Sequence, residues 1–139
     1  MVSPLGIGVE ENWDAAKNGR SGIGYITRFD TADFPVKIAG EVKNFNPEDY
    51  IEDKKEIKKM DTFLHYALAA GTMAVKSSGL VINDENAERI GVLVGAGLGG
   101  LATIERYHEQ YLKGGPRKIS PFFVPMLIIN LAPGQISMY

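Results

Sequence analysis

The sequence predicts an α/β fold in which these 139 residues form only part of a larger domain. Three or four segments have the apolar spacing of amphipathic helices, whereas only two runs have the character of strands. Two strands do not make a stable sheet. The chain also stops at residues 136–139 without a capping or turn signal, so we expect the fold to be incomplete on its own.

The first half is expected to contain two helices and one strand. Apolar residues recur at helical spacing over residues 9–17, before an Asn-Gly stop. Glycines and a proline mark residues 22–35 as a loop, and residues 36–43 alternate apolar and polar side chains, which indicates a half-exposed strand. A long helix is predicted over residues 53–78 and ends at Gly79. The small residues in its second half indicate close packing against another element.

The second half is expected to begin with a strand at residues 89–95 and a helix at residues 101–112. The segment 121–125 is apolar but bounded by prolines. Residues 126–132 are apolar on nearly all sides, and periodicity does not decide between a buried helix and a buried strand.

Composition excludes several classes of protein. The chain is 45% hydrophobic and 23% charged with a net charge of −2, which does not suggest a nucleic acid or an anionic membrane as partner. It contains no cysteine, so a disulfide, a thiolate metal site and a cysteine nucleophile are excluded within these residues. No run is long enough to span a bilayer, and the start lacks a signal peptide, so a cytoplasmic location is expected. We expect no metal and no cofactor.

A glycine-rich turn follows the second expected strand and matches the pattern G-x-G-x-x-G, which places a pyrophosphate at a helix N-terminus. The turn contains Gly95, Gly97, Gly99 and Gly100. A dinucleotide site also requires a second parallel strand that ends in Asp or Glu, and none follows residue 112. We therefore expect the glycines to permit close backbone packing around a tight strand-to-helix turn.

Five segments together resemble the β-ketoacyl-acyl carrier protein synthase II family, the elongating condensing enzymes of type II fatty acid synthesis. They are MVSPLG, RFDTADFPVKIAGEVKNFNPEDYI, KKMDTFLHYALAAG, RIGVLVGAGLGGL and GGPRKISPFFVPMLIINLAPGQIS. The resemblance runs in order across essentially the whole chain. It implies a thiolase-like fold of five α-β-α-β-α layers, a homodimer, and an acyl carrier protein loaded with acyl or malonyl groups as partner. The implied reaction is a decarboxylative Claisen condensation on a cysteine thioester.

The resemblance also implies that residues 1–139 are the N-terminal part of such an enzyme. The family's first strand would precede Met1, and its nucleophilic cysteine and two catalytic histidines would follow Tyr139. We therefore expect no catalytic residue here, and His65, His108 and Ser120 are not assigned such roles. A polyketide ketosynthase, or a ketosynthase-like chain-length partner without the cysteine, remains an alternative.

Two groups of binding residues follow from the resemblance. Leu98 is expected to contact the growing acyl chain, and Phe123, with Phe122 as second choice, to close the partner subunit's pocket from the dimer interface. From pattern alone Leu98 is better explained as a core residue, and the two phenylalanines could also be core. Lys55, Lys58 and Lys59 share one helix face by their spacing, which pattern alone favours as a solvated face. The resemblance implies instead that they belong to the family's carrier-docking patch.

Overall fold

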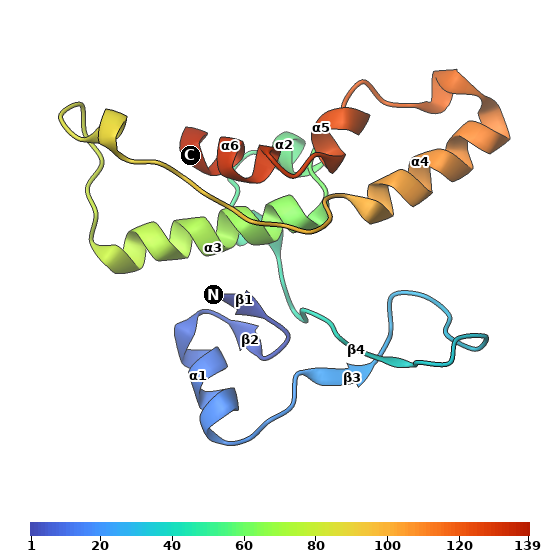
Figure 1. Ribbon diagram of the computed structural model, residues 1–139, viewed down its shortest axis with the longest axis horizontal. Helices are drawn as coiled ribbons and strands as arrows, with labels where there is room; N and C mark the ends of the chain where they lie inside the picture. Colours follow the sequence, from blue (N-terminus) through green and yellow to red (C-terminus); the bar gives the residue numbers. More distant parts are fainter. The chain divides into compact units, whose positions relative to one another are not determined.

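The computed structural model describes all of residues 1–139 and divides into two compact units, Met1–Asn46 and Pro47–Tyr139 (Figure 1). The first unit holds two small hairpins and one helix, and the second is built from helices. Neither unit contains more than a two-stranded sheet, which agrees with the expectation of a fold that is incomplete on its own.

The first unit opens with a small hairpin of two-residue strands, in which β1 (Val2–Ser3) pairs antiparallel with β2 (Gly6–Ile7). Helix α1 (Val9–Lys17) follows with the predicted bounds. Its buried Asn12 ties the helix to the hairpin, because the side-chain amide donates to the carbonyl oxygens of Gly6 and Gly8 at 2.8 and 2.6 Å.

The second hairpin of this unit corrects two sequence predictions. Strand β3 (Ile23–Tyr25) pairs antiparallel with β4 (Ile38–Gly40), so part of the predicted loop is a strand and the strand expected over residues 36–43 is shorter. The loop between them is held by Glu41, whose carboxylate accepts from the Thr27 hydroxyl at 2.8 Å and from the Thr27 amide. Such a cross-strand anchor joins residues far apart in sequence, which local pattern does not reveal.

The second unit contains five α-helices and three 3-10 turns. In chain order they are η1 (Pro47–Asp49), α2 (Lys54–Ile57), α3 (Thr62–Ser78), η2 (Ala87–Arg89), α4 (Leu101–Gly114), η3 (Pro116–Lys118), α5 (Phe123–Leu127) and α6 (Leu131–Met138). The predicted helix at 101–112 is confirmed as α4. The undecided segment 126–132 is helical on both sides of a break, in α5 and α6.

The single long helix expected over residues 53–78 is wrong, because the chain breaks between α2 and α3. Asp61 has an extended backbone, with φ −80° and ψ 161°, and is the N-cap of α3. An N-cap residue leaves the helical region so that its side chain can bond the first free amides of the next helix. The end of α3 is as predicted, at Gly79 with a left-handed φ of 69°.

The strand expected at residues 89–95 is also not formed among these residues. Turn η2 includes residue 89, the first residue of the predicted strand. The segment after it does not pair with any strand (Figure 1). Leu93 is 97% exposed. A strand requires a neighbour for its backbone groups, and the 139 residues provide none for this segment.

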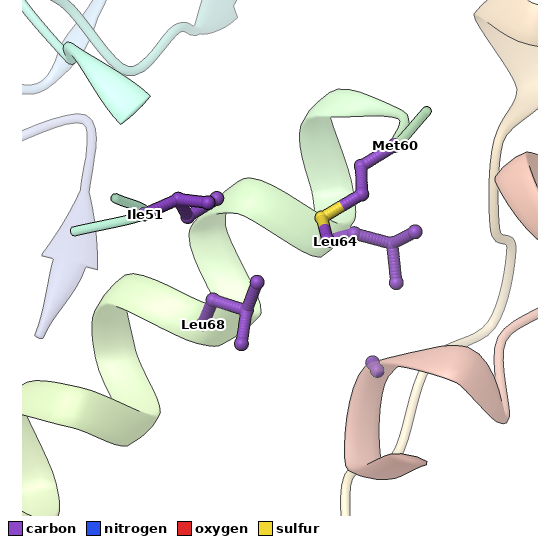
Figure 2. Close-up of a cluster of buried hydrophobic side chains, with 5 residues drawn as sticks. Ile51, Met60, Leu64 and Leu68 are labelled. Atoms are coloured by element: carbon purple, nitrogen blue, oxygen red, sulfur yellow. The ribbon is translucent and has the colours of Figure 1, made fainter. Parts of the chain in front are cut away.

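The core of the second unit lies around the first half of α3. Ile51, Met60, Leu64 and Leu68 converge there, and Ala132 of α6 completes the buried cluster (Figure 2). Farther along α3, a Cβ on Gly71 would lie only 3.1 Å from the side chain of Ile136. The prediction of close packing by the small residues is thus confirmed, with α6 as the element that lies along α3 (Figure 1).

Candidate functional site

The second pair of glycines in the glycine-rich turn packs directly against the backbone of α5. The Gly100 amide donates to the carbonyl oxygen of Leu127 at 3.0 Å. A Cβ on Gly99 would collide with that same oxygen, and a Cβ on Gly100 would lie 2.8 Å from the carbonyl oxygen of Met126. At these two positions the backbones approach too closely for any side chain. The prediction of close backbone packing is confirmed for this pair.

The first pair of glycines has no such neighbour. A Cβ on Gly95 or Gly97 would meet nothing within 4 Å, and neither residue has a left-handed φ. Close packing within these residues therefore explains only half of the motif.

A carboxylate already occupies the N-terminus of α4, where a dinucleotide site would hold its pyrophosphate. Asp61 Oδ2 accepts from the amide of Thr103 at 3.2 Å and from its hydroxyl at 2.6 Å. A phosphate placed there would face this negative charge instead of free amides. The local electrostatics therefore agree with the sequence argument against a dinucleotide.

Leu98 lies between the two pairs of glycines and is 72% exposed. Among these 139 residues it is not part of the core. Gly99 and Gly100, which follow it, are held by their contacts with α5, so the turn presents an apolar side chain next to an anchored pair of residues.

The two adjacent phenylalanines have different surroundings. Phe123 is half-buried, and its ring meets that of Tyr107 edge-on, with centroids 5.2 Å apart and an interplanar angle of 69°. Phe122 is 41% exposed, and the Lys59 ammonium lies 5.1 Å from its ring centroid. Val124 next to them is 55% exposed, so α5 presents an apolar surface.

The three lysines of the expected patch also differ from one another. Lys59 makes two contacts: its ammonium lies over the Phe122 ring, and its Nζ lies 2.5 Å from the Glu56 carboxylate. Lys55 and Lys58 are exposed and form no ion pair. The prediction that the three lie on the first turns of one long helix is wrong, because α2 is a single turn and Lys58 is its C-cap. A lysine at a helix C-terminus is favoured by the helix dipole.

The two histidines lie in different surroundings. His65 Nε2 lies 3.0 Å from the carbonyl oxygen of Ile57, and His108 borders an apolar cavity with Tyr111, Ile119 and Phe123. The Ser120 hydroxyl accepts from the amide of Phe122 at 3.1 Å, which is a local turn contact. No group of three His, Cys, Asp or Glu side chains could hold a metal ion. No helix is both long and apolar enough to cross a membrane.

Sequence reasoning missed the pairing of Asp61 with Thr103. The signal for half of it is present, because an Asp immediately before a helical apolar run is an N-cap pattern. The other half joins residues 42 positions apart, which no local pattern indicates.

Comparison with protein families gives a match over residues 1–139 to the model described as "Beta-ketoacyl synthase, N-terminal domain". The chain is 52% identical over 136 residues to "3-oxoacyl-[acyl-carrier-protein] synthase 2" of Staphylococcus aureus strain N315, covering 98% of this chain and 33% of the relative. The protein of the same name from Vibrio cholerae is 50% identical over 137 residues, covering 99% and 33%. The chain thus spans about a third of the length of the curated relatives it matches.

Two solved structures are also similar. "The ishigamide ketosynthase/chain length factor" matches with a TM-score of 0.80 and 31% identity, over 99% of this chain and 34% of that one. A second, titled "AntDE:AntF (apo): type II PKS acyl-carrier protein in complex with its ketosynthase bound to the hexaketide", matches with a TM-score of 0.65 and 26% identity. That match covers 71% of this chain and 28% of the other.

Proposed function

The chain belongs to the β-ketoacyl synthase family, and we propose that its residues are the N-terminal part of a 3-oxoacyl-acyl carrier protein synthase that elongates fatty acids. The observation that carries this proposal is the match over the whole chain, with 52% identity to a relative of that name. In this proposal the complete enzyme is a cytoplasmic homodimer, without a metal or cofactor.

The proposed reaction joins two thioesters. An acyl group moves from its carrier to a cysteine thiolate, and the carrier thiol leaves. Malonyl-carrier then loses carbon dioxide, and the resulting carbanion attacks the acyl-enzyme carbonyl and expels the cysteine thiolate. The present residues contain no cysteine, so in this proposal they bind and position while residues elsewhere in the protein perform the chemistry.

We assign carrier docking chiefly to Lys55 and Lys58. Both ammonium groups are exposed and form no ion pair, so an acidic carrier surface can approach them without displacing an internal partner. Complementary charge of this kind mainly steers and orients an encounter. Lys59 has a smaller share, because docking there would compete with Glu56 and the Phe122 ring.

We assign the acyl pocket and the dimer interface to the glycine-rich turn and to α5. Leu98 presents an exposed apolar side chain next to the anchored residues Gly99 and Gly100, as a residue that touches an acyl chain requires. The exposed surface of Phe122 and Val124 would be covered by a second subunit. Phe123, whose packing against Tyr107 fixes its ring, and Phe122 are the candidates for closing the partner's pocket.

Two alternatives keep the same fold. A polyketide ketosynthase would share the carrier and the condensation, and a chain-length partner would share the interface without the chemistry. One similar structure has "chain length factor" in its title, and the other has "type II PKS". The 52% identity to a 3-oxoacyl-[acyl-carrier-protein] synthase, against 31% to the ketosynthase/chain length factor, favours the proposal of a fatty acid elongating enzyme.

The test is a condensation assay on the complete protein from the same gene. We expect acyl-carrier to acylate the enzyme and malonyl-carrier to yield one 3-oxoacyl product per condensation. Mass spectrometry detects both the acyl-enzyme and the product. A folded protein that is never acylated would be a chain-length partner, and a product elongated repeatedly without reduction would indicate a polyketide enzyme. The 139-residue chain is the matched control, because without a cysteine it should give no product.

A further inference from the structure

Asp61 contacts two helices with one carboxylate. Its Oδ1 faces the amide of Phe63 in the first turn of α3, at 3.5 Å. Its Oδ2 accepts from the amide and the hydroxyl of Thr103 in the first turn of α4, at 3.2 and 2.6 Å. The N-termini of two helices that lie far apart in sequence are therefore held at the same side chain.

The contact with α4 has the features of a strong interaction. Thr103 is only 3% exposed, so water competes little for its hydroxyl. Hydrogen bonds to a charged acceptor are roughly twice as strong as those between neutral groups. A carboxylate at a helix N-terminus is also stabilised by the helix dipole.

The same carboxylate borders the glycine-rich turn. A Cβ on Gly100 would lie 2.9 Å from Asp61 Oδ2, and the Gly100 amide is bonded to Leu127 of α5. The turn therefore sits between two fixed neighbours, the Asp61 carboxylate and the backbone of α5. Leu98 lies two residues before Gly100 and is 72% exposed, so these anchors, more than its own packing, determine where it is.

A comparison with the other capping aspartate shows what is specific to Asp61. Asp53 caps α2 by accepting from the amide of Lys55 at 2.7 Å, a contact within its own helix. Asp61 reaches across 42 residues to α4. Removing Asp53 should affect one helical turn, whereas weakening Asp61 should release the turn that carries Leu98.

We infer that Asp61, acting through Thr103, is a positioning residue that holds Leu98 in place and thereby sets the acyl-chain selectivity of the enzyme. This inference rests on the proposed function, because it assumes that Leu98 touches the acyl chain. Losing the Thr103 hydroxyl leaves Asp61 with only the longer amide contact to α4. The first turn of α4 and the residues before it then move, and the pocket loses its fixed boundary.

The experiment compares Thr103→Val with Thr103→Ser in the complete enzyme. Valine keeps the shape of threonine but removes the donor, whereas serine keeps the donor. The measurement is kcat/KM for a long and a short acyl-carrier, together with the melting temperature. We expect Thr103→Val to change the long-to-short ratio by roughly tenfold, because a misplacement of about 1 Å can cost about 100-fold in rate and this displacement should be smaller. Thr103→Ser should keep the wild-type ratio.

Asp53→Ala is the matched control, because it removes a capping carboxylate that does not touch α4. It should leave the ratio unchanged. Asp61→Asn, which keeps the shape and loses the charge, should change the ratio in the same direction as Thr103→Val and provides a second test if valine impairs folding. An equal loss of activity on both chain lengths would overturn the inference and leave only a structural role. A wild-type enzyme that forms no product would instead overturn the proposed function.

Discussion

Replacing Gly99 with alanine should destabilise the contact between the glycine-rich turn and α5. The added Cβ would collide with the carbonyl oxygen of Leu127 and approach the Ile129 side chain to 3.1 Å. The acceptor is backbone, so it cannot move aside as a flexible side chain would. Overpacking of this kind costs about 1–3 kcal/mol, and weakening the Gly100 to Leu127 hydrogen bond adds about 0.5–1.5 kcal/mol.

Gly97→Ala is the matched control, because its Cβ would meet nothing within 4 Å and its φ is not left-handed. Alanine at such a position stabilises by about 0.4–1 kcal/mol, since it restricts the unfolded chain. Hydrogen exchange in the first turn of α4 and in α5 measures the local free energy of opening in both variants. Equal protection in Gly99→Ala and Gly97→Ala would refute the packing argument.

The remaining predictions concern the pocket, the dinucleotide and one loop. Leu98→Phe in the complete enzyme should shorten the longest acyl chain that is accepted, and unchanged selectivity would mean that Leu98 does not contact the chain. Neither NAD nor NADP should bind, and saturable micromolar binding abolished by Gly97→Val would contradict this. Hydrogen bonds from Thr27 hold the pKa of Glu41 below its ordinary value, so the loop should be anchored at neutral pH and released as pH falls through that lowered pKa. Exchange of the Thr27 amide, corrected for its intrinsic rate, should show this pH dependence, and Glu41→Gln should remove it.

The helices that the sequence predicted well are those whose signals are local. α1 and α4 carry their own apolar stripes and are bounded by glycine turns, so both appear where the pattern places them. The break at Asp61 was missed because the apolar stripe continues through it from Met60 to Leu64, while the capping contact decides the backbone.

The strand predicted at residues 89–95 failed because a strand depends on residues outside its own segment. Its composition is that of a buried strand, but a strand depends on neighbours, and none of the 139 residues pairs with it. Sequence pattern reports the propensity of a segment and not the presence of its partner.

The candidate site divides in the same way. The sequence indicates where the lysines and the glycine-rich turn lie, but not which member of each group makes a contact. The contact of Lys59 with Phe122 and the closeness of Gly99 to Leu127 both join distant parts of the chain. The difference between Lys59 and Lys55, and between Gly99 and Gly97, is therefore visible only in the folded structure.

The most direct test of a carrier-docking surface is to reverse the charge of Lys55 and Lys58 in the complete enzyme. Each exposed pair should contribute about 0.2–1 kcal/mol, so the double change to Glu should be clearer than either alone. We expect a raised KM for carrier-linked substrate, little change with a pantetheine thioester, and a defect that shrinks in high salt, where the Debye length is about 3 Å at 1 M. Lys59→Gln should have a smaller effect. Equal losses on carrier-linked and carrier-free substrates, independent of salt, would contradict the assignment of these lysines to carrier docking.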